Sequence, residues 1–257
     1  MTEPLLLSTT RVSTFRGRQL LTAATSFFFA RGERLFAVTS RHVLHDAPSG
    51  HFPDRAEFVL HVDARDLTRW VLFSVPLYRD GLAVWRQGTD SAGEVDVAVL
   101  ELERQHLPEH VVLRAFEPRH LQPTATEVEV GAPLLVVGFP LGFYDTRHHL
   151  PVVRHAIISS SFGVRFQGEG YFLTDGRMHR GSSGAPVVMR WKGGDPAMPW
   201  RLLGVHAARM DMGGRDLARD ETLGLNCAWY ADILMTLTEG DSAPDAPRSR
   251  GTAAAPR

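Results

Sequence analysis

A serine enclosed by glycines is the feature of the sequence that most strongly suggests chemistry. Residues 181–188 read Gly-Ser-Ser-Gly-Ala-Pro-Val-Val, so Ser183 lies in a tight loop that leads into an apolar strand. In such a loop a hydroxyl nucleophile lies beside backbone N–H groups aimed at a developing oxyanion, and each donor lowers the barrier by about 3–4 kcal/mol. A Gly-Ser-Ser-Gly stretch alone is more often a flexible loop. The proline and the strand that follow favour a nucleophile.

Two further segments supply a base and a carboxylate. Residues 36–44 form an apolar strand followed by a Thr-Ser turn and His42. In the apolar strand at 95–102, alternation places Asp96 on the same face as Ala98 and Leu100. A carboxylate there is costly unless a partner compensates it, as an imidazole would. Taken singly, each also has a plain interpretation, His42 as a structural residue and Asp96 as the solvated start of a strand.

Together these residues follow the chain order His42, Asp96, Ser183, which is the order of the chymotrypsin triad. The sequence resembles the trypsin-like (chymotrypsin-fold) serine peptidases, specifically the bacterial HtrA-type and related branches. Thr39-Ser40-Arg41-His42-Val43 is similar to their Thr-Asn-x-His-Val, and Asp96-Val97-Ala98-Val99-Leu100 to their Asp-hydrophobic-Ala-hydrophobic-Leu. Further similar segments are Thr174-Asp175 ahead of Gly181, Ser183-Gly184-x-Pro186, Gly138-Phe139-Pro140, Leu203-Gly204-Val205 and Leu223-Gly224-Leu225.

The resemblance implies a serine endopeptidase acting on a protein or peptide substrate. Ser183 would be the nucleophile and His42 the general base and then the acid, while Asp96 would orient the imidazole. The N–H groups of Gly181 and Ser183 would form the oxyanion hole, and an acyl-enzyme would form and be hydrolysed. No metal or cofactor is implied. Two alternatives stay open: a catalytically idle binding module on the same fold, and a latent peptidase switched on by a regulatory partner in a stress or defence pathway.

Alignment on the serine motif also predicts a primary specificity pocket. Its residues are Arg177, His179, Ala207, Arg209, Gly224 and Asn226. With Arg177 at the floor and Arg209 on the rim, two guanidiniums would favour an acidic side chain. If Arg177 turns outward, the pocket is small and apolar and accepts Val, Ala or Leu. We expect no cleavage after Lys or Arg, because no carboxylate lies at the predicted floor.

Three departures from the family pattern qualify this interpretation. Ser182 stands where trypsin-like zymogens carry an aspartate that pairs with a new N-terminus, so activation by propeptide cleavage is not expected. Residues 24–28 read Ala-Thr-Ser-Phe-Phe in place of Gly-x-Gly-Phe, and Ala185 replaces a glycine. No PDZ domain is expected in the same chain.

The elements that must position these residues are short apolar runs bounded by turn residues, which indicate an all-β fold. Strands are expected at 25–29, 34–38, 56–62, 70–75, 95–102, 134–137, 152–159, 170–174, 185–190 and 201–207. Helices are expected only at 40–44 and 230–238. The prediction is one peptidase domain over 1–240, made of two six-stranded antiparallel barrels at about 12–117 and 123–229 with a C-terminal helix. Residues 241–257 are too poor in apolar groups to order themselves and should form a disordered tail.

Composition limits the binding partners and the cellular compartment that are expected for the protein. The 257 residues carry a formal net charge of -1, which argues against a nucleic-acid-binding role. Cys227 is the single cysteine, so no intramolecular disulfide forms, and no signal peptide or membrane-spanning run is visible. A cytoplasmic protein without membrane contact is therefore expected, and the resemblance to the HtrA-type branch implies a bacterial one. His42 and His45 have metal-ligand spacing but lack the glutamate that metallopeptidases require, and Pro108 interrupts any helix between His106 and His110. No metal site is therefore expected.

Overall fold

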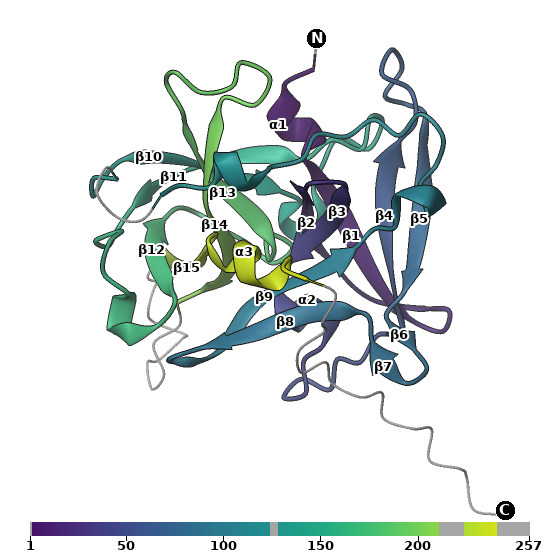
Figure 1. Ribbon diagram of the computed structural model, residues 1–257, viewed down its shortest axis with the longest axis horizontal. Coiled ribbons are helices and arrows are strands. Elements are labelled where there is room, and N and C mark those ends of the chain that lie inside the picture. Colours follow the sequence, from purple (N-terminus) through teal and green to yellow (C-terminus); the bar gives the residue numbers. More distant parts are fainter. Residues whose placement is uncertain (1, 124–127, 211–223, 241–257) are drawn as a thin grey trace, which may run out of the picture.

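The computed structural model describes residues 2–123, 128–210 and 224–240, and these fold into two β units that pack side by side (Figure 1). The first unit is a seven-stranded sheet in the order β5-β4-β1-β2-β3-β9-β8. Its strands are β1 (Thr9–Arg16), β2 (Gln19–Arg31), β3 (Arg34–Thr39), β4 (Arg55–His61), β5 (Trp70–Pro76), β8 (Trp85–Asp90) and β9 (Gly93–Glu101). All neighbouring strands in it pair antiparallel.

The second unit is a closed six-stranded barrel in the order β10-β11-β12-β15-β14-β13. Its strands are β10 (Pro133–Gly138), β11 (Val152–Ile158), β12 (Tyr171–Asp175), β13 (Ala185–Arg190), β14 (Trp200–Arg209) and β15 (Leu225–Tyr230). The remaining elements are short: β6 (Tyr78–Arg79), β7 (Leu82–Ala83), α1 (Pro4–Leu7), α2 (Arg41–Leu44), α3 (Ile233–Leu237), and the 3₁₀ turns η1 (Arg104–His106), η2 (Pro118–His120), η3 (Pro140–Gly142) and η4 (Phe166–Gly168).

The all-β class and the closed second barrel are confirmed, and the first unit differs in detail. It has seven strands in an open order instead of six in a barrel. Two of its strands, β1 and β8, were not predicted because their sequences, TTRVSTFR and WRQGTD, contain few apolar residues. Pairing of their backbones with β2 and β9 holds them in the sheet. The C-terminal helix is also shorter than expected, because Tyr230 belongs to β15.

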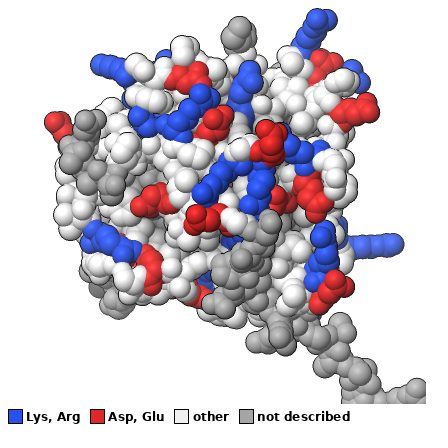
Figure 2. All heavy atoms as spheres, in the orientation of Figure 1, with Lys and Arg blue, Asp and Glu red and all other residues white. Residues whose placement is uncertain are grey.

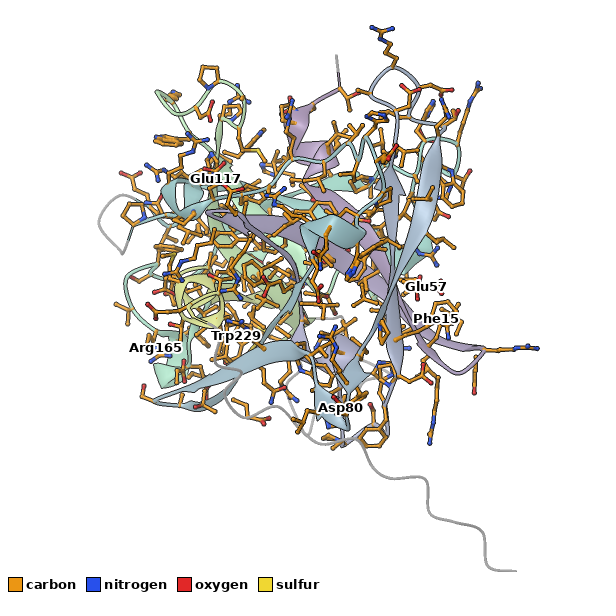
Figure 3. All side chains as sticks on the ribbon, turned by 45° about the vertical axis from the view of Figure 1, so that its right-hand side comes forward. Phe15, Glu57, Asp80, Glu117, Arg165 and Trp229 are labelled. Carbon is orange, nitrogen blue, oxygen red and sulfur yellow. The ribbon has the colours of Figure 1, made fainter. Side chains whose placement is uncertain are left out.

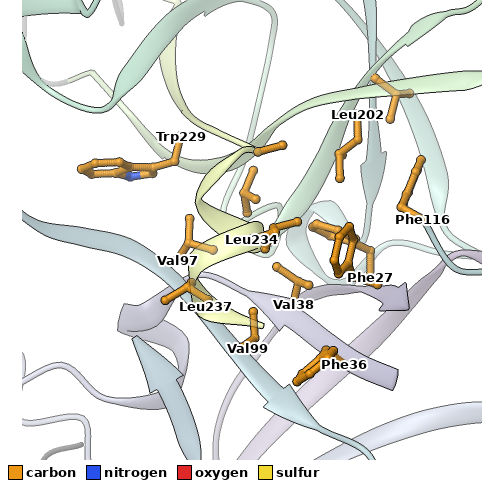
Figure 4. Packing of buried hydrophobic residues seen from close by; sticks show 14 of the residues in the cluster. Phe27, Phe36, Val38, Val97, Val99, Phe116, Leu202, Trp229, Leu234 and Leu237 are labelled. Carbon is orange, nitrogen blue, oxygen red and sulfur yellow. The ribbon is translucent and has the colours of Figure 1, made fainter. Parts of the chain in front are cut away.

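One hydrophobic cluster joins the two units. It combines Phe27, Val38, Val97 and Val99 of the first sheet with Val188, Leu202, Val205 and Trp229 of the barrel. Leu234 and Leu237 of α3 pack into the same cluster, on the side where β9 and β15 approach each other (Figure 4). A shared, close-packed core resists relative motion of the units. Side chains on the first unit are therefore held at a fixed position relative to those on the barrel.

Charges of both signs are interspersed over the face seen in Figure 2. On β1 and β4 of the first sheet, the Arg55 guanidinium lies 4.3 Å over the Phe15 ring and Nε of Arg55 donates to Glu57 Oε1 at 3.1 Å. Phe15 and Glu57 are labelled in Figure 3. Within the described residues, no helix has the length and apolar character needed to cross a membrane. The predicted tail, 241–257, lies outside those residues.

Candidate active site

The backbone brings His42 and Asp96 together at one end of two neighbouring strands of the first sheet, β3 and β9. Strand β3 ends at Thr39, and His42 follows in the single turn of α2. Thr39 pairs with Ala98 on β9. Asp96 lies two residues from Ala98 on the same face, and therefore extends just beyond the end of β3, where α2 begins. Chain segments 54 residues apart are thus placed in contact.

Asp96 accepts two hydrogen bonds from His42. The ring Nδ1 lies 2.7 Å from Asp96 Oδ2, and the backbone N–H of His42 donates to Oδ1 at 2.9 Å. Burial lowers the pKa of His42, but the hydrogen bond and the negative charge of Asp96 more than offset this, so its pKa lies above the ordinary 6.5. Both carboxylate oxygens are occupied, so Asp96 is not the solvated strand start of the plain interpretation.

The loop that carries Ser183 depends on two glycines with left-handed backbone. Gly184 has φ +84°, and a Cβ there would lie 2.2 Å from the Thr25 carbonyl oxygen. Gly181 has φ +90°, and a Cβ would lie 2.4 Å from the Phe139 carbonyl oxygen. Any side chain at either position would meet backbone atoms that cannot move aside. The glycines that flank the serine are therefore demanded by the close approach of the first sheet and of the segment after β10.

The N–H groups of Gly181 and Ser183 donate to no other group in the described part of the chain. Their directions are nevertheless set. The Leu141 N–H donates to the Arg180 carbonyl at 2.6 Å, and the Ala185 N–H donates to the Ser182 carbonyl at 2.9 Å. In a planar trans peptide the N–H points opposite to the carbonyl, so these bonds orient the N–H groups of Gly181 and Ser183. Two oriented donors without partners are the requirement for an oxyanion hole.

Ser183 and His42 line one cleft of about 320 Å³, together with residues 21–24 of β2, Asp46 and Arg180. The Ser183 hydroxyl donates to the Ala207 carbonyl at 3.0 Å. Among the described residues no hydrogen bond joins Ser183 to His42. Ser183 and His42, the predicted nucleophile and base, thus lie on the same cleft without a hydrogen bond between them.

Two of the predicted pocket residues, His179 and Ala207, contact the serine loop, whereas the side chain of Arg177 is exposed. Ala207 lies beside Ser183 and supplies the carbonyl that the hydroxyl contacts. His179 is half-buried, and its carbonyl accepts the Ser182 N–H at 3.1 Å. Arg177 is exposed, and its carbonyl accepts a bond from Arg154 at 2.7 Å. These contacts place His179 and Ala207 in the structure of the serine loop and leave the Arg177 side chain in solvent.

Asn226 acts on the backbone of the predicted pocket. It is 1% exposed, and its Nδ2 lies 3.3, 2.8 and 3.1 Å from the carbonyl oxygens of Thr174, Gly176 and Gly224. The amide therefore ties the end of β12 to the start of β15. Arg209 pairs with Asn226 across β14 and β15; its side chain lies outside the described residues.

Sequence reasoning missed three residues here. Asp175 is exposed at the end of β12, and its Oδ1 would lie 3.9 Å from a Cβ at Gly224, so a carboxylate does lie near the predicted pocket. His206 on β14 is buried, and burial together with the charge of His42 lowers its pKa to about 4. Thr25 contacts the serine loop directly. Asp175 stands next to Thr174 in the serine motif and Thr25 lies in the departing segment 24–28, so both had a sequence signal, whereas His206 had none.

The described residues contain no group of three or more His, Cys, Asp or Glu side chains placed to hold a metal ion.

A seven-stranded sheet that carries a His-Asp pair packs here against a closed barrel that carries a glycine-enclosed serine. This arrangement is typical of the chymotrypsin-like class of folds. The chain belongs to the trypsin-like peptidase family: the profile of the trypsin-like peptidase domain matches residues 24–192. No curated protein sequence matches the chain.

Among solved structures, the chain is similar to the HtrA-type protease AlgW with a tripeptide, at 16% identity and a TM-score of 0.54, covering 90% of this chain and 58% of that one. It is also similar to a serine endoprotease from Yersinia pestis, at 15% identity and a TM-score of 0.52, covering 90% of this chain and 61% of that one. The chain thus spans about three-fifths of the length of these two proteins, and the likeness supports the fold.

Proposed function

We propose that the chain is a serine endopeptidase that hydrolyses peptide bonds with Ser183 as nucleophile, His42 as general base and Asp96 as the orienting carboxylate. The observation that carries this proposal is the doubly bonded His42–Asp96 pair, on a cleft shared with Ser183. Membership of the trypsin-like peptidase family supports the same reaction class.

The proposed reaction uses these groups in turn. The Ser183 hydroxyl turns from the Ala207 carbonyl towards His42 Nε2, gives up its proton there and attacks the scissile carbonyl. The carbonyl oxygen becomes an oxyanion that accepts hydrogen bonds from the N–H groups of Gly181 and Ser183. His42 then protonates the leaving amine. Water, deprotonated by His42, hydrolyses the acyl-enzyme, and Asp96 stabilises the imidazolium in both stages.

Reaction with a fluorophosphonate separates this proposal from a catalytically idle binding module. The reagent phosphonylates only an activated serine, with loss of fluoride. We expect a single adduct on Ser183 by peptide mass spectrometry, and none in Ser183→Ala. An unmodified Ser183 after prolonged incubation of folded protein would contradict the proposal.

A second candidate is a latent peptidase switched on by a partner. It is favoured by one observation, the hydrogen bond from the Ser183 hydroxyl to the Ala207 carbonyl. In a latent enzyme, fluorophosphonate labelling is slow and a regulatory protein accelerates it. In a constitutive enzyme the hydroxyl turns freely, and labelling is fast without any addition.

The pH dependence of kcat/KM should report on His42. Only the neutral imidazole accepts the Ser183 proton, and the pKa of His42 is raised above 6.5 by Asp96 and, at longer range, by Asp46. On the acidic side of the profile, kcat/KM should therefore fall to half of its maximum at a pH above 6.5. Asp46→Asn removes one of the charges that raise this pKa, so its limb should shift to lower pH. A limb that lies well below pH 6.5 in the unchanged enzyme would contradict the assigned base.

A peptide library tests the pocket. Because the Arg177 side chain is exposed, we propose a small apolar pocket that accepts Val, Ala or Leu before the cut. Acidic residues at that position would mean that Arg177 turns inward on binding. Dominant Lys or Arg would contradict the alignment of the pocket and would point to Asp175.

The same proposal covers the setting, the substrate and the control of the enzyme. We place it in the bacterial cytoplasm, acting on a protein or peptide substrate. A partner in a stress or defence pathway controls it. These assignments rest on the family, on the single buried thiol of Cys227 and on the resemblance to HtrA-type enzymes. A profile of cleaved proteins in cells with the unchanged chain and with Ser183→Ala identifies the substrate.

A further inference from the structure

Thr25, on β2, lies where the first sheet meets the serine loop, and it makes four hydrogen bonds while fully buried. Its N–H donates to the Ser183 carbonyl at 3.0 Å, and its hydroxyl donates to the Gly181 carbonyl at 2.7 Å. The hydroxyl accepts the Phe139 N–H at 3.1 Å, and the Thr25 carbonyl accepts the Thr39 hydroxyl at 2.8 Å. A hydroxyl that both donates and accepts in a buried site has one fixed orientation.

These bonds reach the residues whose N–H groups form the proposed oxyanion hole. Four consecutive carbonyls of the serine loop are each held, Arg180 by the Leu141 N–H, Gly181 by the Thr25 hydroxyl, Ser182 by the Ala185 N–H and Ser183 by the Thr25 N–H. With every carbonyl anchored, the planar peptide units between them have fixed directions. Thr25 supplies two of these anchors from a strand of the other unit.

The Thr25 hydroxyl also connects the serine loop to the segment after β10. Through Phe139 it holds the start of residues 139–142, the segment whose Leu141 N–H anchors the Arg180 carbonyl. Gly138 permits this contact, since a Cβ there would lie 2.5 Å from the Thr25 hydroxyl oxygen. Loss of the hydroxyl would therefore loosen two anchors, one directly and one through this segment.

We propose that Thr25 is a positioning residue that holds the oxyanion hole of Ser183 in its productive geometry. The inference rests on the proposed function and adds to it a residue that touches neither the substrate nor the reacting atoms. Because a preorganised oxyanion hole acts on the transition state, loss of the Thr25 hydroxyl should lower kcat and leave KM nearly unchanged.

The test compares Thr25→Val and Thr25→Ala with Thr25→Ser. We expect kcat to fall by about tenfold to a hundredfold in the first two, since small displacements of catalytic groups cost up to about a hundredfold. Thr25→Ser keeps the hydroxyl and should recover most of this loss. Thr25→Ala applies the same prediction without a methyl group pressing on Gly138, in case the valine variant does not fold.

A peptide aldehyde gives a readout that a purely structural role would not move. The Ser183 oxygen adds to the aldehyde carbon, the serine proton passes to His42, and the carbonyl oxygen becomes an oxyanion in the hole. Aldehyde affinity should weaken by the same factor as kcat/KM in Thr25→Val and Thr25→Ala. Affinity for the matching peptide alcohol, which forms no oxyanion, should not change.

Thr10→Val is the matched control. The Thr10 hydroxyl is also buried and donates to a distant backbone carbonyl, that of Val59, at 2.7 Å, but it lies away from the cleft. It should lower the melting temperature and leave kcat and aldehyde affinity unchanged. If Thr25→Val or Thr25→Ala matches Thr10→Val in kcat and aldehyde affinity, the inference is overturned while the proposed function stands. An unchanged chain that neither turns over peptides nor reacts with fluorophosphonate overturns both.

Discussion

Replacing Ser183 by alanine should lower kcat for peptide hydrolysis by about a million-fold, because triad members act as a unit and loss of the nucleophile costs on that order. The fold should survive. Among the described residues the Ser183 side chain makes one hydrogen bond, to the Ala207 carbonyl, and the bond from the Thr25 N–H to the Ser183 carbonyl remains in alanine. Hydrolysis of a fluorogenic peptide measures the loss, and far-ultraviolet circular dichroism reports the fold.

Ser182→Ala is the informative control for this experiment. Ser182 is the adjacent serine of the same loop, but its side chain is buried at 2% exposure and lies outside the residues that line the cleft. It should retain most of the activity. Should Ser183→Ala keep more than a few per cent of the peptidase activity, Ser183 is not the nucleophile.

The second large effect is expected for Asp96→Asn, with a loss of roughly ten-thousand-fold in kcat. The carboxylate accepts from both the ring Nδ1 and the backbone N–H of His42. An asparagine has one acceptor oxygen. If that oxygen keeps the backbone bond, the amide NH₂ faces Nδ1, and the ring then carries its proton on Nε2. In that tautomer Nε2 cannot take the proton of Ser183.

Asp46→Asn distinguishes this tautomer effect from the loss of a negative charge near the imidazole. The charge of Asp46 raises the pKa of His42, but no hydrogen bond joins the two side chains among the described residues. Asp46→Asn should shift the pH profile and keep turnover at its optimum. The role of Asp96 would be refuted by an Asp96→Asn enzyme within tenfold of the unchanged one at every pH.

The glycines of the serine loop could be recognised from the sequence, because the ability to adopt positive φ is a local property of glycine. Gly181 and Gly184 adopt positive φ values of 90° and 84°, which glycine adopts without the steric penalty that a side chain brings. The strand at 34–38 and the following turn with His42 were also expected, and β3 and α2 lie there. Apolar alternation and glycine sterics act over a few residues, so they can be identified in a single sequence.

The assembly of the site was decided by tertiary structure. Asp96 reaches His42 because β3 and β9 pair in a register that joins Thr39 to Ala98. Thr25 reaches Gly181 across 156 residues of chain. The sequence contains no local signal of either contact, because strand pairing is set by the packing of whole sheets.

The sequence by itself therefore determined the all-β class, the chain order of His42, Asp96 and Ser183, and the presence of glycines on both sides of the serine pair. The tertiary structure decided that the first unit is a seven-stranded sheet, that Arg177 faces solvent, and that Asn226 binds three backbone carbonyls. The physical reason is the distance along the chain over which each interaction acts. Steric limits on φ and alternation along a strand act between neighbouring residues. Registers, exposed side chains and buried hydrogen bonds exist only once distant segments have packed together.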